Sequence, residues 1–134
     1  MIGKEIKLFE LIREIENLYP DLRSDLAGIE WKRIWLPKIQ DSCRDLTGKG
    51  IYRLVLRENE KIGYVGQAVN IKERWYQHVK KMIGMLPVGN EKLYKYDRPD
   101  AFKWTVVEEG DMVDLNESEK YWIQYFGMGL NSKL

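Results

Sequence analysis

The sequence contains very few residues that could form covalent or metal cross-links. Among 134 residues there is one cysteine, Cys43, and one histidine, His78. A single cysteine cannot form an internal disulfide, and a single histidine cannot build a structural zinc cluster. No apolar run approaches the ~20 residues of a membrane-spanning helix, and the N-terminus lacks the pattern of a signal peptide. These absences predict a cytoplasmic protein with no membrane partner.

The composition is that of an ordinary globular domain, with 44% hydrophobic and 32% charged residues and a net charge of +1. The charge is unevenly spread: residues 50–98 carry 10 basic and 5 acidic side chains, and residues 99–134 carry 3 and 7. A basic middle segment could meet a polyanion, and an acidic C-terminal segment could hold a cation. Solvated surface charge gives the same counts, so both interpretations stay open.

The first part of the chain is predicted to be helical. Residues 4–19 place apolar side chains at helical spacing, and Pro20 closes this amphipathic helix. A second helix is expected over about residues 24–36. We therefore predict an N-terminal helical extension over residues 1–48 and a second domain over residues 49–134.

The pattern changes after residue 48 from helical to alternating. Two strands joined by a polar loop predict a β-hairpin, and Asn70 is a candidate cap for the helix that follows it. The expected elements are strands at 51–56 and 62–66, a helix at 71–82, a loop with one helical turn at 83–99, a strand at 101–107 and a helix at 116–126. This order predicts an α+β fold, with a small three-stranded, mainly antiparallel sheet flanked by helices.

The last helix is expected to end at Gly127 and Gly129. Its inward-facing side chains are predicted to be Leu115, Tyr121, Trp122 and Tyr125.

Several residues with chemical potential have ordinary explanations when taken singly. Tyrosines on strands are good β-formers, an Arg/His pair four residues apart on a helix is usually a surface contact, and a late-helix glutamate is usually solvated. The residues concerned are Tyr52, Tyr64, Arg74, His78, Glu119 and Asn131. None of them predicts a function alone.

Together, these residues fall in a series of motifs that resembles the GIY-YIG nuclease family. Five motifs occur in the order of that family, over residues 50–131. They are Gly50-Ile51-Tyr52, Tyr64-Val65-Gly66, Arg74 followed by His78, Glu119 within residues 117–123, and Gly129-Leu130-Asn131. Leu130 replaces the tyrosine of the last motif, and no second histidine is available for a mechanism that needs two imidazoles.

The resemblance implies a divalent-metal-dependent nuclease that hydrolyses phosphodiester bonds, with DNA rather than RNA as the expected substrate. It implies that Glu119 holds a single Mg²⁺ or Mn²⁺ ion and that Arg74 binds the scissile phosphate. It also implies that Tyr52 lies near the attacking water, as base or orienting partner, while Tyr64 lines the same surface by hydrogen bonding.

The remaining members of the set are expected to support this site. Asn131 would tie the C-terminal segment against it, and Gly66 would permit close backbone approach. An unperturbed tyrosine has a pKa of ~10, so Tyr52 needs Arg74 or the metal to become a base. His78 could instead accept or relay the proton, or only position the tyrosine hydroxyl. The identity of the base stays open. The alternative functions are a catalytically inactive nucleic-acid-binding module and a structural scaffold.

Overall fold

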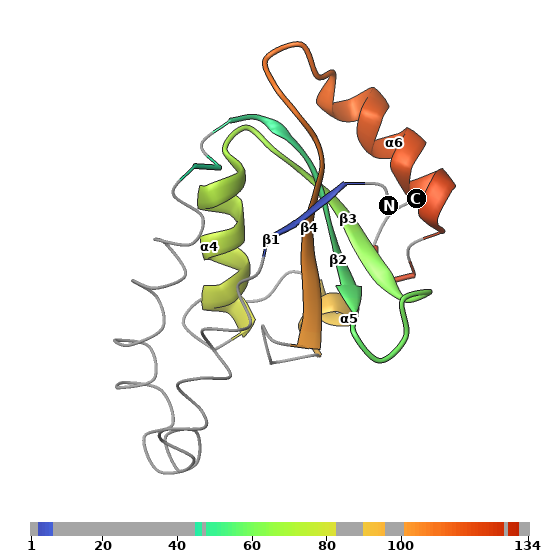
Figure 1. The fold of residues 1–134 in the computed structure, drawn as a ribbon. Coiled ribbons are helices and arrows are strands. Elements are labelled where there is room, and N and C mark those ends of the chain that lie inside the picture. Colours follow the sequence, from blue (N-terminus) through green and yellow to red (C-terminus); the bar gives the residue numbers. More distant parts are fainter. Residues whose placement is uncertain are drawn as a thin grey trace.

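A computed structural model describes residues 3–6, 45–46, 48–82, 90–95, 101–127 and 129–131. The strands are β1 (Lys4–Ile6), β2 (Gly50–Leu56), β3 (Gly63–Ala68) and β4 (Phe102–Glu109), and the helices are α4 (Ile71–Met82), α5 (Glu91–Tyr94) and α6 (Leu115–Phe126). The strands form one antiparallel sheet in the order β1-β4-β2-β3 (Figure 1). The predicted α+β class is confirmed, but the sheet has four strands rather than three.

The additional strand comes from the segment that was predicted to be helical. β1 pairs with β4, with Lys4 opposite Val106 and Ile6 opposite Trp104. The prediction of a helix from residue 4 is therefore wrong for these residues, because backbone pairing with β4 and packing of Ile6 against the core override the local periodicity. The other residues of the two predicted N-terminal helices lie outside the described residues.

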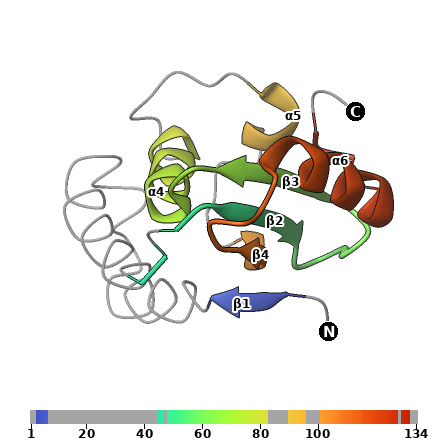
Figure 2. The ribbon, with the colours of Figure 1, turned by 90° about the horizontal axis from the view of Figure 1, so that it is seen from above.

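Alternating side chains of β2 and β3 divide the core between the two faces of the sheet. Tyr52 and Leu54 pack on the face covered by α4, together with the fully buried Trp75. Ile51 and Val65 point to the opposite face, which is covered by α6. The two helices thus lie on opposite faces of the sheet, and β3 forms one of its edges (Figures 1 and 2).

Asparagine side chains cap the helices that follow the hairpin. The Asn70 side-chain oxygen accepts a hydrogen bond from the amide of Glu73 at 3.1 Å, as expected for the start of α4. Asn90 accepts from the amides of Lys92 and Leu93, at 3.1 and 3.3 Å, and so starts α5. This confirms the single helical turn predicted within the loop after α4.

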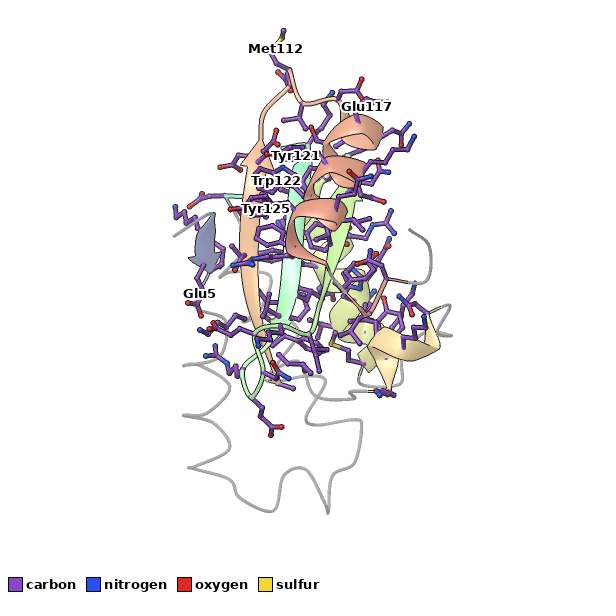
Figure 3. The ribbon with its side chains drawn as sticks, turned by 90° about the vertical axis from the view of Figure 1, so that its right-hand side faces the viewer. Glu5, Met112, Glu117, Tyr121, Trp122 and Tyr125 are labelled. Atoms are coloured by element: carbon purple, nitrogen blue, oxygen red, sulfur yellow. The ribbon has the colours of Figure 1, made fainter. Side chains whose placement is uncertain are left out.

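The last helix begins and ends at clear signals, but its orientation differs from the prediction. Asp114 caps its N-terminus, and Gly127, with φ 62°, ends it by donating its amide to Ile123 at 2.9 Å. Tyr121 and Tyr125 were predicted to face inward and are instead 57% and 56% exposed (Figure 3).

The reason for this difference is the position of α6 over the β3 side of the sheet. The side chains that reach the core lie on the neighbouring stripe of the helix and are Leu115, Trp122, Ile123 and Phe126.

Across the residues that the structure describes, no helix has the length and apolar character to span a bilayer.

Candidate active site

The two hairpin tyrosines lie side by side on the α4 face of the sheet. The ring centroids of Tyr52 and Tyr64 are 6.2 Å apart. Gly66 lies opposite Tyr52 in the β2–β3 register. A Cβ atom on this glycine would come within 2.5 Å of the Tyr52 hydroxyl oxygen and 2.8 Å of the Tyr64 ring. Only glycine therefore leaves room for both rings at this position.

His78 projects from α4 between two tyrosine hydroxyls. Its Nε2 lies 2.6 Å from the hydroxyl of Tyr52, and its Nδ1 lies 2.5 Å from the hydroxyl of Tyr94 on α5. Burial, reinforced by the positive charges of Arg74 and Lys81, lowers the pKa of His78 to about 3. The ring is therefore neutral at pH 7. A neutral imidazole has one donor and one acceptor, so it donates to one tyrosine and accepts from the other.

The environment keeps both hairpin tyrosines protonated. Burial raises the pKa of Tyr52 well above its ordinary value, the neighbouring Tyr64 raises it further, and the charge of Arg74 opposes these effects. Burial also raises the pKa of Tyr64, which a hydrogen bond with Tyr52 opposes. Tyr52 is completely buried, whereas Tyr64 is only partly buried. Tyr64 is therefore the hydroxyl that solvent or a substrate reaches first.

Arg74 is on α4 and Glu119 is on α6, and the two are close enough for the charge of Arg74 to act on Glu119 although the helices cover opposite faces of the sheet. Burial raises the pKa of the half-buried Glu119, while a hydrogen bond with Gln67 and the positive charge of Arg74 oppose this rise. The same carboxylate raises the pKa of Tyr64. Gln67 extends from β3 and also donates to Asn116 on α6 at 3.0 Å. The side chains of Arg74, Glu119, Tyr64 and Gln67 therefore share one electrostatic environment.

Asn131 closes the free edge of β3. Its side-chain oxygen accepts from the amide of Val65 at 3.0 Å, and its side-chain nitrogen donates to the carbonyl of Val65 at 2.7 Å. The amide of Leu130 donates to the carbonyl of Gly63 at 2.9 Å. The C-terminal segment thus pairs with the strand that carries Tyr64, and it satisfies backbone groups that an edge strand would otherwise expose.

Every candidate residue is therefore connected to the same region of the fold. The charge of Arg74 acts on the pKa of Tyr52, Tyr64, His78 and Glu119, Gly66 lies beneath the tyrosine rings, and Asn131 is bonded to the edge strand β3.

A model of the GIY-YIG catalytic domain matches residues 48–131, which is more than half of the chain. The chain belongs to the GIY-YIG family. Membership identifies a nuclease, a hydrolase that acts on nucleic acid. The search for similar curated proteins and the search for similar solved structures each find no match.

The acidic part of this GIY-YIG site consists of one carboxylate. The described part of the chain has no group of three or more His, Cys, Asp or Glu side chains arranged to hold a metal ion. Magnesium is commonly held in proteins by one or two carboxylates, with water completing the coordination. A half-buried Glu119 next to neutral amide side chains is compatible with such an ion.

Three residues of the GIY-YIG site were not identified from the sequence. Tyr94 gave no signal, because it is one of two tyrosines, with Tyr96, in a segment rich in turn residues. Gln67 directly follows the second motif and could have been noticed for its position. Asn90 precedes a short amphiphilic stretch, and its capping preference is the signal that could have found α5.

Proposed function

We propose that this protein is a divalent-metal-dependent endonuclease that hydrolyses phosphodiester bonds in DNA. The observation that supports this most strongly is that Arg74 on α4, Glu119 on α6 and Tyr64 on β3 are close enough for their charges to act on one another's pKa. A guanidinium group, a carboxylate and a hydroxyl in one place are the groups that phosphodiester hydrolysis needs.

The side chains of this site have distinct proposed roles. Arg74 is exposed, and its planar guanidinium binds two oxygens of the scissile phosphate, where it stabilises the charge that develops during attack. The attacking water binds beside the partly exposed Tyr64. Tyr52 lies directly behind it, fully buried, and orients the Tyr64 hydroxyl rather than touching the water.

Glu119 is the proposed metal-binding residue, with Mg²⁺ or Mn²⁺ as the single ion. Its burial makes an uncompensated negative charge unfavourable, so a cation that binds there is favoured electrostatically. A divalent ion bound at Glu119 would supply Lewis-acid activation and neutralise negative charge on the phosphate. The Gln67 side chain positions the carboxylate through their hydrogen bond.

Basic side chains on the α4 side of the site support nucleic acid as the substrate. Five lysines with exposed or partly exposed side chains belong to α4 or to the α5 region, namely Lys72, Lys80, Lys81, Lys92 and Lys95. Such charges bind phosphates without reading sequence, and the binding weakens as the salt concentration rises.

Cleavage assays test the proposal. The wild-type protein is incubated with supercoiled plasmid, single-stranded DNA and RNA, in Mg²⁺, Mn²⁺ or EDTA, beside Glu119→Gln and the control Glu117→Gln. Glu117 is on the first turn of the same helix and exposed, so we expect its variant to preserve the fold, and it changes the charge equally. We expect metal-dependent cutting of DNA by the wild type and by Glu117→Gln only.

Two results would contradict the proposal. Cutting that persists in EDTA or in Glu119→Gln would show that cleavage does not depend on a metal ion held by Glu119. Binding of DNA without any cutting, by a wild-type protein that also fails to bind Mn²⁺ in calorimetry, would favour the inactive binding module. Preferential cutting of RNA would correct the substrate and leave the site in place.

A further inference from the structure

The single histidine of the protein is bonded at both ring nitrogens to a tyrosine hydroxyl. Tyr52 contacts Nε2 of His78 at 2.6 Å, and Tyr94 contacts Nδ1 at 2.5 Å. Tyr52 is 0% exposed and His78 is 4% exposed, whereas Tyr94 is only partly buried. The chain of hydrogen bonds thus leads from the fully buried Tyr52 to a side chain that is only partly buried.

We propose that Tyr94 is the outer end of a proton relay running from the active site through Tyr52 and His78, and is therefore a positioning residue for the nuclease reaction. This inference rests on the function proposed above. Tyr94 belongs to none of the five motifs that define the site.

The relay answers a problem that the burial of the site creates. Attack by water releases a proton at Tyr64, whose partly exposed side would be covered by the bound phosphate. Tyr52, behind it, has no direct contact with solvent through which to pass the proton on. The proton cannot remain on His78, because the ring would become a buried cation beside Arg74 and Lys81, and its pKa of about 3 reflects that cost. A proton that arrives at Nε2 must therefore leave from Nδ1, where Tyr94 is bonded.

The transfer is balanced without any further reactant. Before the attack, the Tyr52 hydroxyl turns its proton from Tyr64 to Nε2 of His78, so that it can accept from Tyr64. As the water oxygen bonds to phosphorus, its O–H bond breaks and the proton bonds to the Tyr64 oxygen, whose own proton moves to Tyr52. The Tyr52 proton moves to Nε2 of His78, the Nδ1 proton moves to the Tyr94 oxygen, and the original Tyr94 proton enters solvent. All four side chains end neutral, nothing is oxidised or reduced, and the imidazole has changed tautomer.

The fold holds Tyr94 firmly in this position. The amide of Tyr94 donates to the carbonyl of Asn90 at 3.0 Å, and the Asn90 side chain donates to the carbonyl of Leu130 at 2.9 Å. Leu93, next to Tyr94, is completely buried. The Lys81 ammonium lies 5.5 Å from the centre of the Tyr94 ring. The same C-terminal segment that pairs with β3 therefore also fixes the helical turn that presents Tyr94 to His78.

Tyr94→Phe tests the relay, with Tyr76→Phe as its matched control. Tyr76 is a partly buried tyrosine on α4 that packs against the same core and lies under Lys80. We expect Tyr94→Phe to lower kcat on the order of 10²-fold with KM for DNA unchanged, since the hydroxyl acts on proton transfer and not on binding. Tyr76→Phe should retain the wild-type kcat.

The outcomes separate this inference from the proposed function. If wild type cuts, Glu119→Gln does not, and Tyr94→Phe is as fast as Tyr76→Phe, then the nuclease stands and the relay is wrong. If the wild type does not cut at all, the proposed function fails and the relay fails with it, whereas a second measurement, on the ring of His78, tests the relay separately.

That second measurement is nitrogen NMR of the histidine ring, which is free of overlap because His78 is the only histidine. We expect a neutral ring from pH 5 to pH 9 and a clear change in the Nδ1 shift in Tyr94→Phe. A ring that titrates near pH 6.5, or an Nδ1 shift that Tyr94→Phe leaves unchanged, would overturn the relay even if that variant folds poorly for other reasons.

Discussion

At the scale of single residues, close contacts at this site can restrict a position to one particular amino acid, not only to a polar, charged or apolar one. Gly66 is opposite Tyr52, and any side chain there would overlap a phenol ring. Arg74 is the opposite case, since it is exposed and makes its proposed contribution through charge and geometry. The motif residues could be found from the sequence, but Tyr94 could not, because only the fold brings α5 to the ring of His78.

Gly66→Ala is expected to destabilise the protein and displace Tyr52. The added methyl group overlaps the Tyr52 hydroxyl and the Tyr64 ring, and such overpacking typically costs about 1–3 kcal/mol in the free energy of unfolding. Urea unfolding measures this loss. Gly48→Ala is the control, since a Cβ there would meet nothing within 4 Å. Equal stability of the two variants would show that the tyrosines do not pack against Gly66.

Arg74→Ala is expected to slow DNA cleavage by roughly 10²–10³-fold, the usual loss when a group that stabilises transition-state charge is removed. Because Arg74 is exposed, thermal unfolding should change little. Single-turnover kinetics measure the effect, with Arg74→Lys as the variant that keeps the charge but loses the planar fork. A rate within about twofold of wild type would exclude Arg74 from the phosphate site.

At the scale of elements, strong local signals were read correctly and weak ones were overridden by tertiary contacts. The hairpin, the start of α4 and the end of α6 follow from strand patterns, Asn70 and Gly127. β1 could not be predicted, because three residues inside a helix-like pattern become a strand only by pairing with β4. The exposure of Tyr121 likewise depends on where α6 lies on the sheet, which periodicity alone does not define.

Asn131→Ala is expected to loosen the edge of β3. The substitution removes both bonds to Val65 and leaves a buried amide and carbonyl unsatisfied, at a cost of about 1–3 kcal/mol in the free energy of unfolding. Hydrogen exchange of the Val65 amide should accelerate by more than the global change in stability. Asn59→Ala is the control, because its bond to the Lys61 amide is exposed. An unchanged Val65 exchange rate would contradict this support.

At the scale of the whole molecule, a neutral buried histidine couples stability to pH. The pKa of His78 is about 3 in the folded protein, against an ordinary value of ~6.5 in the unfolded chain. Below pH 6.5 only the unfolded state gains this proton, so the stability associated with His78 is complete above pH 6.5 and declines as the pH falls toward 3. Glu119 acts in the opposite direction, because its raised pKa lets the folded state gain a proton earlier.

We therefore expect the wild type to lose about 2 kcal/mol more than His78→Gln when the pH is lowered from 6.5 to 5. Denaturant unfolding at the two pH values measures this difference, and comparison of the two proteins cancels the carboxylates that they share. The same pH dependence in both proteins would mean that His78 is not held neutral.

The central claim is that Arg74 and Glu119, carried on opposite faces of the sheet, form one site around the edge of β3. Carboxyl carbon NMR titration of Glu119, in the wild type and in Arg74→Ala, tests this most directly and needs no activity. We predict a raised pKa for Glu119 in the wild type that rises further when the arginine charge is removed. A pKa that Arg74→Ala leaves unchanged would show that the two side chains do not share a site.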